Sequence, residues 1–273
     1  MKISAEEYKV ETRKQWNATP CGTDEALNRL GKGSLAFFDA VRRSRYEVTD
    51  AWMTRVMNFH SAAGKRLLEV GYGMGTDLLT WCENGAEVHG IDLTEEHHRL
   101  AVENFGLHNC HADLRVGDAA KLPFEDESFD IVYSHGVLHH TPDIEQCLSE
   151  IRRVLRPGGR LILGLYHKWS AFHIYSKIFY DGLVRGLLFT HGYAGLMATL
   201  ERGADGARIR PLVRTYSRGE VRRLLSSYSD VDIKVAGLGG ESLPRIGRFI
   251  PGAVIRKLEP WLGWYVVGIG NKK

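Results

Sequence analysis

The chain lacks most of the features that mark secreted, membrane-spanning or repetitive proteins. Its 273 residues include only Cys21, Cys82, Cys110 and Cys147, and none of them forms a C-x-x-C pair. Cysteines this far apart predict reduced, buried thiols in a cytoplasmic protein rather than a disulfide framework. No uninterrupted apolar run approaches the roughly 18–20 residues that span a bilayer. The opening residues, MKISAEEYKVETRK, are charged, which argues against a signal peptide.

Acidic residues are scarce in the C-terminal third. The first 167 residues hold 25 acidic and 19 basic side chains, whereas residues 168–273 hold 8 acidic and 17 basic ones. One interpretation is an uneven solvated surface. The other is that the C-terminal third faces something anionic, such as a phosphorylated or carboxylated substrate or a lipid surface.

From Lys65 onward, short apolar runs alternate with helical stretches, whereas residues 1–60 show no strand pattern and predict helices. Helices are expected at 76–84, 94–105 and 143–155, the last one stopping at the RPGG turn. This βαβαβ alternation predicts an α/β fold with a doubly wound, Rossmann-like parallel sheet. The expected strands, several of them apolar on both faces, are 66–72, 86–93, 112–118, 129–135, 160–167, 231–239 and 264–270.

Two segments interrupt this pattern and are expected to be insertions. Residues 168–215 are aromatic and apolar and predict one or two amphipathic helices, followed by a helix that Ser217 and Glu220 begin as a capping box. Residues 240–262 are basic, apolar and broken by proline. We therefore expect a helical cover at 1–64 and a domain at 65–273 that contains the insertions 168–215 and 240–262.

The stretch LLEVGYGMGTD, residues 67–77, places Gly71, Gly73 and Gly75 at every second position. Glycine is costly inside a strand or helix, but a glycine-rich turn between the two lets a nucleotide approach the backbone and the helix N-terminus. The G-x-G-x-G spacing differs from the G-x-G-x-x-G of dinucleotide folds. Glu69 lies just before it in an apolar strand, where a carboxylate needs a partner. Loop N–H groups and the amino end of a ligand are the alternatives.

Two later strand ends carry acids that suit an adenosine. Asp92 ends the second expected strand, where a carboxylate can accept both hydroxyls of a ribose. Asp118 and Ala119 end the third. Asp118 could accept from an adenine amino group, and Ala119 could supply a small wall or a backbone N–H.

The motifs E-x-G-x-G-x-G, I-D, G-D-A, F-D-I-V and L-R-P-G-G make residues 66–167 resemble a class I S-adenosylmethionine-dependent methyltransferase, in the broad group that includes ubiquinone- and menaquinone-type enzymes. The resemblance implies seven strands, with the last one antiparallel between the fifth and sixth. It implies S-adenosylmethionine as cofactor and S-adenosylhomocysteine as product. The cofactor-binding positions that it implies are Glu69, Gly71, Tyr72, Gly73, Gly75, Asp92, Leu93, Asp118, Ala119, Ser134 and His135.

Methyl transfer from a sulfonium is a direct displacement, so positioning supplies much of the acceleration. Where the acceptor must lose a proton, histidine is the residue best tuned to take it near neutral pH. The candidates are His139, His140 and His167, although a histidine here could also pack under the next helix or cap its start. No carboxylate or cysteine stands at metal-ligand spacing from them, so no metal is expected.

The insertion 168–215 is expected to cover a small, apolar or aromatic acceptor, with O-, N- and C-methylation all open. The basic C-terminal third favours an acceptor that is anionic or lipid-like. Peripheral membrane contact through the basic stretch 245–264 is a further hypothesis. The aromatic side chains that would line the acceptor pocket, or simply pack as a helical lid, are Trp169, Phe172, Tyr175, Phe179 and Phe189.

Three other functions share parts of this pattern. An NAD(P)-dependent oxidoreductase would use a similar sheet, but the glycine spacing, Glu69 and the G-D-A turn argue against it. A non-catalytic S-adenosylmethionine-binding partner or sensor protein would keep the same loop. Nucleic-acid methylation at amino groups normally uses an Asn/Asp-Pro-Pro-aromatic turn after the fourth strand, where this chain reads SHGV, so no nucleic-acid partner is expected. Oligomeric state leaves no mark on the sequence.

Overall fold

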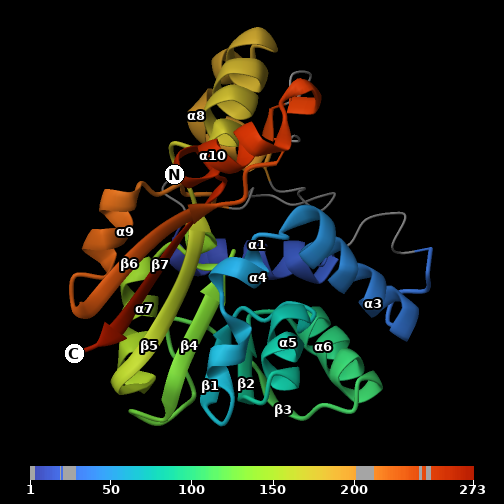
Figure 1. Ribbon diagram of the computed structural model, residues 1–273, viewed down its shortest axis with the longest axis vertical. Helices are drawn as coiled ribbons and strands as arrows, with labels where there is room; N and C mark the ends of the chain where they lie inside the picture. Colours follow the sequence, from blue (N-terminus) through green and yellow to red (C-terminus); the bar gives the residue numbers. More distant parts are fainter. Residues whose placement is uncertain (1–3, 19, 21–28, 201–211, 240–241, 244–246) are drawn as a thin grey trace.

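A seven-stranded sheet forms the centre of the chain (Figure 1). The computed structural model describes residues 4–18, 20, 29–200, 212–239, 242–243 and 247–273. The strand order is β3-β2-β1-β4-β5-β7-β6, and β7 runs antiparallel to both β5 and β6 while the remaining pairs are parallel. The predicted α/β fold and its antiparallel last strand are therefore confirmed. The strands are β1 (Arg66–Val70), β2 (Glu87–Asp92), β3 (Ala112–Val116), β4 (Phe129–His135), β5 (Leu155–Tyr166), β6 (Tyr228–Ala236) and β7 (Tyr265–Lys272).

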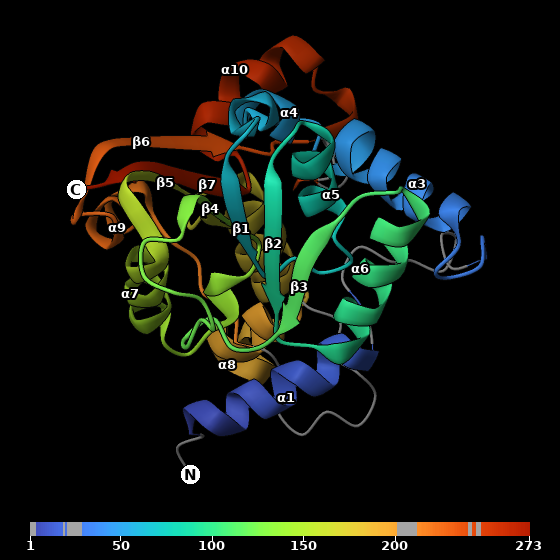
Figure 2. The ribbon, with the colours of Figure 1, turned by 90° about the horizontal axis from the view of Figure 1, so that it is seen from below.

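Helices lie on both faces of this sheet, with α5 and α6 on one side and α7 and α9 on the other (Figure 2). The alternation of side chains along the strands separates two cores. Leu67 and Ile131 pack with the α5 and α6 face, whereas Leu68 and Val132 pack with the α7 and α9 face. The bounds are α4 (Met53–Val56), α5 (Thr76–Glu83), α6 (Glu95–Leu107), α7 (Ile144–Val154) and α9 (Arg218–Leu224). The predicted capping box at the start of α9 is confirmed.

The chain before β1 is helical and covers one end of the sheet. Helix α1 (Ala5–Ala18) lies across the carboxyl ends of β2 and β3 (Figure 2). Helix α3 (Leu35–Arg43) packs Phe37 and Phe38 into a small core with the loop after β1 and with α6. A π-helix η1 (Ser44–Thr49), α4 and a 3-10 helix η2 (Phe59–Ala62) then lead to the sheet. The boundary at residue 64 stays a prediction.

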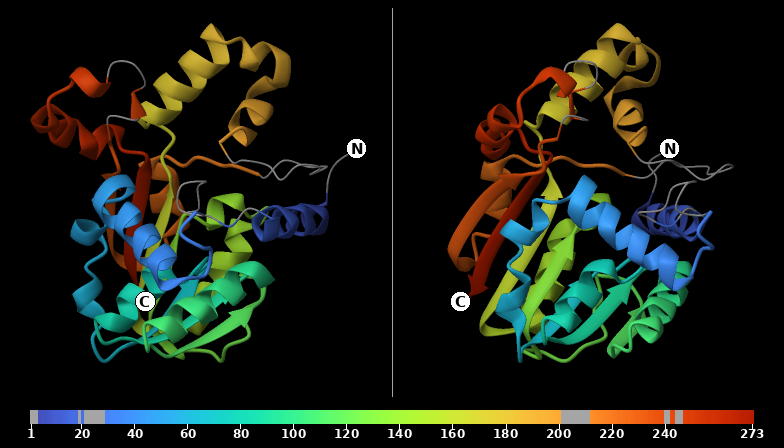
Figure 3. Two further views of the ribbon diagram at one scale, coloured as in Figure 1. Left: turned by 90° about the vertical axis from the view of Figure 1, so that its right-hand side faces the viewer. Right: turned by 45° about the vertical axis from the view of Figure 1, so that its right-hand side comes forward.

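The two insertions project beyond the carboxyl end of β5 and lie side by side (Figures 1 and 3). The first contains the π-helix η4 (Phe172–Val184) and α8 (Leu187–Ala198), and the second contains the 3-10 helix η6 (Gly247–Phe249) and α10 (Gly252–Leu262). The Ser176 hydroxyl joins them by donating to the Ser242 carbonyl at 2.8 Å. We call the described residues of 168–200 and 242–262 the head. None of the helices that the structure describes is both long and apolar enough to cross a membrane.

Strand β5 begins five residues earlier than expected. Phe129 pairs with Leu155 and Ile131 with Arg160, so the RPGG residues bulge out of the ladder between these two pairs. Gly158 adopts a φ of +73° there, a conformation that favours glycine. The turn signal was therefore correct, but the chain already pairs with β4 before the turn.

The prediction of buried cysteines is correct only for Cys147. Cys82 and Cys110 are free thiols and partly exposed, and Cys21 lies outside the described residues. Burial, followed by the neighbouring Cys82 thiol, raises the pKa of Cys110 to about 11. Cys82 and Cys110 are far apart in the sequence, so the sequence could not predict that their thiols are neighbours.

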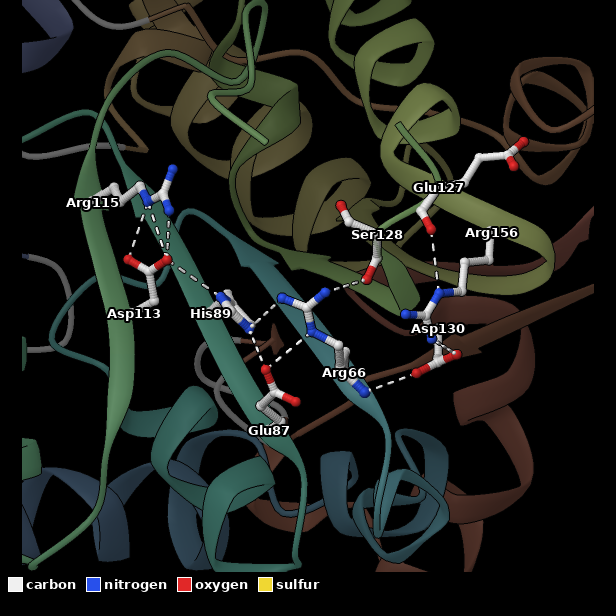
Figure 4. Close-up of polar contacts among 9 residues, drawn as sticks. All are labelled: Arg66, Glu87, His89, Asp113, Arg115, Glu127, Ser128, Asp130 and Arg156. Atoms are coloured by element: carbon white, nitrogen blue, oxygen red, sulfur yellow. Dashed lines mark hydrogen bonds and ion pairs between the residues drawn. The ribbon is translucent and has the colours of Figure 1, made fainter. Parts of the chain in front are cut away.

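A row of charged side chains crosses the amino-terminal half of β1, β2 and β3 (Figure 4). Arg66 and Glu87 are register partners and form an ion pair at 3.0 Å, and His89 and Asp113 repeat this arrangement one strand along at 3.4 Å. The opposite charges of Arg66 and Glu87 on neighbouring strands support the pairing. The row explains why polar residues interrupt these strands at the end away from the ligand cavity described below.

Candidate functional site

A cavity of about 500 Å³ lies at the carboxyl ends of β1 to β4 and is covered by α1 and η1. The chain reverses its strand order between β1 and β4, which is the position where doubly wound sheets bind ligands. Gly75 and Ser134 do not line the cavity. The nine predicted cofactor positions that line it are Glu69, Gly71, Tyr72, Gly73, Asp92, Leu93, Asp118, Ala119 and His135.

The three loop glycines serve different purposes. All have positive φ, at +82°, +55° and +76° in chain order, so each would be strained as another residue. A Cβ on Gly71 would meet Val137 Cγ2 at 2.3 Å, and one on Gly75 would meet Phe105 Cε2 at 3.0 Å. A Cβ on Gly73 would meet no atom within 4 Å. The protein's own side chains therefore exclude Gly71 and Gly75 substitutions, and only the Gly73 backbone is open towards the cavity.

Asp92 holds the glycine loop in place. Its Oδ2 accepts the Gly73 N–H at 2.9 Å, and its Oδ1 accepts the Thr94 N–H and hydroxyl at 3.0 and 2.9 Å and His97 Nδ1 at 3.1 Å. Burial would raise the pKa of Asp92, but these bonds, led by the one from His97, lower it. An ionised carboxylate at this position suits ribose hydroxyls and fixes the loop at the same time.

Glu69 is not the loop organiser that one reading of the sequence suggested. Its carboxylate is buried at the cavity floor, and Oε2 has no hydrogen-bond partner among the described residues. Burial, then the charges of Asp77 and Asp92, raise the pKa of Glu69 well above its usual range. A buried carboxylate without a partner is expensive, which leaves the alternative interpretation, a ligand amino group, as the one that fits.

Asp118 lies at the opposite end of the cavity and is bonded to α1. Lys9 Nζ contacts Asp118 Oδ2 at 2.5 Å, and Asp118 Oδ1 accepts the Ala120 N–H at 2.9 Å. The bond to Asp118 raises the pKa of Lys9. Lys9, Thr12 and Trp16 also line the cavity, so α1 forms a wall at the expected adenine end. The expected helical cover at 1–64 includes this helix, but no motif in the sequence singled out Lys9 or Thr12.

A buried ion pair that sequence reasoning missed lies beside Glu69. Asp77 accepts Arg45 Nε and Nη2 at 2.6 Å each, the Tyr46 hydroxyl at 2.7 Å and the Tyr133 hydroxyl at 2.8 Å. Burial would raise the pKa of Asp77, but Arg45 outweighs it and lowers the pKa to about 2. The pair joins η1 to the start of α5 at the cavity wall. A carboxylate in the first turn of an apolar helix was the only available signal.

Ser134 and His135 end β4 but have different surroundings. The Ser134 hydroxyl donates to the Val70 carbonyl at 2.9 Å and is fully buried. His135 lines the cavity, contacts Trp52 and Tyr265, and has no hydrogen-bond partner for either ring nitrogen within the described ranges. Burial, followed by Arg45, lowers the pKa of His135 to about 3. The ring is therefore neutral at physiological pH.

Of the three candidate catalytic histidines, only His140 lines the cavity. Its Nδ1 donates to the Leu212 carbonyl at 2.8 Å, which makes Nε2 the basic nitrogen. His139 is completely buried against Tyr166, with ring centroids 3.7 Å apart, and burial lowers its pKa well below the usual value. His167 is buried between β5 and β7, with Nδ1 at 3.1 Å from the Gly263 carbonyl.

The prediction that aromatic residues of the first insertion line the acceptor pocket is wrong for this cavity. None of the five predicted side chains is among the described residues that line it, and Trp169, Phe179 and Phe189 are exposed. The aromatic lining comes instead from Trp16 on α1, Tyr166 at the end of β5 and Tyr265 at the start of β7. Within the described part of the chain, no group of three or more His, Cys, Asp or Glu residues is placed to hold a metal ion.

Comparison with known proteins identifies the part of the chain that contains the glycine loop. Residues 68–163 match the family described as a methyltransferase domain. The chain carries a methyltransferase domain. This family implies S-adenosylmethionine as cofactor, and the comparisons do not favour an oxidoreductase or a non-catalytic binding protein.

Three curated relatives each match a little under two fifths of this chain. Phosphoethanolamine N-methyltransferase 2 of Caenorhabditis elegans is 35% identical over 38% of this chain and 24% of its own length. Phthiotriol/phenolphthiotriol dimycocerosates methyltransferase 1 of Mycobacterium ulcerans is 42% identical over 37% of each chain. 27-O-demethylrifamycin SV methyltransferase of Amycolatopsis mediterranei is 40% identical over 37% of this chain and 39% of its own. The chain thus matches between a quarter and two fifths of these relatives' lengths.

Solved structures share the fold of the methyltransferase domain over a longer stretch. The YcgJ protein of Bacillus subtilis matches with a TM-score of 0.52 and 20% identity, over 80% of this chain and 97% of that one. A methyltransferase of Aquifex aeolicus matches with a TM-score of 0.52 and 16% identity, over 86% and 97%. At such low identity the likeness concerns the fold alone.

Proposed function

We propose that this protein transfers the methyl group of S-adenosylmethionine to a small-molecule acceptor. The observation that carries the proposal is that Glu69, the open Gly73 backbone, Asp92 and Asp118 all line one cavity. Aromatic and histidine side chains line the same cavity. Cofactor and acceptor would therefore share one enclosed space.

The residues present fit this cofactor. The unpartnered Glu69 Oε2 would accept the amino group of the methionine part, Asp92 the ribose hydroxyls and Asp118 the adenine amino group. Adenine binding would then compete with Lys9 for Asp118. When bound, S-adenosylmethionine supplies a methyl group already activated by the sulfonium, so the protein's task is to exclude water and align the acceptor.

We propose His140 as the base for acceptors that must lose a proton. Its ring is oriented by the Leu212 carbonyl, so Nε2 would take the proton as the acceptor atom bonds to the methyl carbon. His135 is too weakly basic for this role and would accept a hydrogen bond instead. His139 and His167 are proposed to be packing residues, because neither lines the cavity.

Replacing His140 by glutamine tests the assignment. We expect kcat to fall by about 10² or more, with a smaller effect on KM. His167→Gln is the matched control, since His167 also bonds a carbonyl through Nδ1 but lies away from the cavity. A comparable loss of kcat in both variants would contradict the assignment of His140.

The acceptor is proposed to be small and apolar or aromatic. Trp16, Tyr166 and Tyr265 give the cavity aromatic walls, which favour a flat or greasy molecule. The relatives' names mention phosphoethanolamine, phthiotriol/phenolphthiotriol dimycocerosates and 27-O-demethylrifamycin SV. These names are diverse, and each relative matches only part of this chain, so the atom that receives the methyl group is left open.

Calorimetry and labelled transfer together test the function. S-adenosylmethionine and S-adenosylhomocysteine should bind, and NAD should not. Methyl-labelled cofactor incubated with a cell extract should label an extractable small molecule, and the Gly73→Arg variant, which fills the open side of the loop, should not. Binding of NAD alone would overturn the cofactor assignment. Equal labelling by both proteins would overturn the enzyme assignment.

A further inference from the structure

The head exposes most of the protein's large apolar side chains. Of the 18 strongly exposed large hydrophobic residues in the described chain, 11 belong to the head, although the head is a small part of the molecule. Every exposed tryptophan and phenylalanine among them is there, including Phe189 at 79% and Trp261 at 66% exposure. Single exposed apolar residues are ordinary, but a cluster that contains most of them marks a contact surface.

Helices α8 and α10 of the head have the composition of helices that bind to a surface. Residues 186–200, which contain α8, include no Asp, Glu, Lys or Arg. None of the residues of α10, all of which are described, is buried, although its sequence GAVIRKLEPWL is mostly apolar. A solvated helix should be polar, and a core helix should be buried. An apolar helix that is exposed along its length suits an interface between water and a greasy phase.

The charges beside the exposed apolar residues favour a lipid surface over a purely apolar partner. Arg256 and Lys257 lie in α10 beside Val254, Leu258 and Trp261, and both are exposed. Neither forms an ion pair within the described ranges of the chain, whereas the head acids Asp181 and Glu259 are paired with protein cations. Two cations, Arg256 and Lys257, therefore reach solvent beside the apolar cluster. Exposed cations with tryptophan and phenylalanine complement an anionic bilayer surface.

The head is also joined to the cavity by aromatic stacking. Trp264, just after α10, stacks on Tyr166 of the cavity wall with ring centroids 4.3 Å apart. Phe172, at the start of η4, contacts the same tryptophan at 4.9 Å. A surface docked through the head would thus lie on the acceptor side of the cavity rather than at the adenine end.

We propose that the head docks this protein on an anionic lipid bilayer, with α8 and α10 lying in the interface. Docking does not depend on the methyltransferase function proposed above, and it is measured without turnover. The apolar side chains enter the headgroup region, and Arg256 and Lys257 bind the anionic lipid headgroups. This places the cavity next to apolar molecules dissolved in the membrane.

Vesicle sedimentation with the full chain tests the proposal. The protein should sediment with phosphatidylcholine–phosphatidylglycerol vesicles at low salt, and much less with phosphatidylcholine alone or at high salt. Arg256→Glu with Lys257→Glu should lower the partition coefficient by about thirtyfold. Phe189→Ser with Trp261→Ser should lower it by roughly tenfold or more.

Matched controls separate docking from unspecific changes. Val102→Ser with Leu107→Ser removes two exposed apolar residues from α6, at the other end of the molecule, and should leave sedimentation unchanged. Far-ultraviolet circular dichroism and thermal unfolding of each variant show that it is folded. The proposal is overturned if the wild type stays in the supernatant, or if the α6 control loses as much binding as the head variants. It is also overturned if sedimentation velocity without lipid shows a dimer that Phe189→Ser with Trp261→Ser dissociates, because the head would then be an interface between copies.

Discussion

Replacing Asp77 by asparagine is expected to lower the free energy of unfolding by about 2–3 kcal/mol, although asparagine has nearly the same shape. Asp77 is buried and accepts four hydrogen bonds, two of them from Arg45. An amide keeps the size of the side chain but loses the charge and one acceptor oxygen. The Arg45 guanidinium then remains at the cavity wall without its main partner.

The magnitude follows from two observations. The pKa of Asp77 falls from 3.8 to about 2, which corresponds to about 2 kcal/mol of preference for the ionised form in the folded protein. Removing one partner of a buried pair typically costs about 3–5 kcal/mol. Arg45 is 27% exposed and keeps a contact to Asp50 at 3.5 Å, so the lower part of that range applies.

Urea unfolding followed by circular dichroism measures the effect in a double-mutant cycle. Asp77→Asn and Arg45→Met should each destabilise the protein, and the double variant should lose less than the sum of the two. Tyr46→Phe, which removes one hydroxyl bond to Asp77, should cost only about 1 kcal/mol. Because the pKa of Asp77 is lowered on folding, its contribution is present above pH 3.8 and is lost as the pH falls towards 2. Additive single effects, or a cost below about 1 kcal/mol, would refute the ion-pair reasoning.

Four further outcomes are expected. Glu69→Gln should raise stability near neutral pH, because burial raises the pKa of this carboxyl above 4.5 and its ionised form is unfavourable at higher pH; the gain should vanish below pH 4.5 in thermal unfolding. The same variant should weaken S-adenosylmethionine binding by about tenfold or more in calorimetry. Gly71→Ala should destabilise the fold by about 1–3 kcal/mol through contact with Val137, and Val137→Ala should restore part of that loss in urea titrations. Gly73→Ala should cost only about 1–2 kcal/mol for its left-handed backbone, yet abolish cofactor binding.

The sheet was predictable because its signals are local. Apolar runs such as residues 66–70 and 129–135 report burial on both faces, and short connections limit how neighbouring strands can be joined. The antiparallel β7 came from resemblance rather than from periodicity. The glycine loop was also visible locally, because positive φ leaves few alternatives to glycine.

The sequence could predict only those site residues that lie at the carboxyl end of a single strand. Asp92 ends β2, Asp118 follows β3 after Gly117, and both line the cavity. Arg45 and Asp77 form an ion pair although they are 32 positions apart in the sequence. Lys9 and Asp118 are in contact although 109 positions separate them. No spacing rule connects such residues, because α1 and η1 are positioned by packing and not by the sheet. For the same reason the sequence could not show that Val137 occupies the space a side chain at Gly71 would need.

The head shows why composition alone could not predict which aromatic residues line the cavity. Aromatic residues such as Phe179 and Phe189 have the same helical spacing whether they face a pocket or a surface, so the helices were predictable and their orientation was not. Exposure decides the question, since these side chains point away from the cavity, whose aromatic walls come from strand ends. A pocket lined by β5 and β7 is held rigidly by the sheet, whereas the exposed helices beyond it are free to meet a second surface. The two proposals therefore assign separate roles to these residues: Tyr166 and Tyr265 would contact the acceptor inside the cavity, and the exposed residues of the head would contact its source outside it.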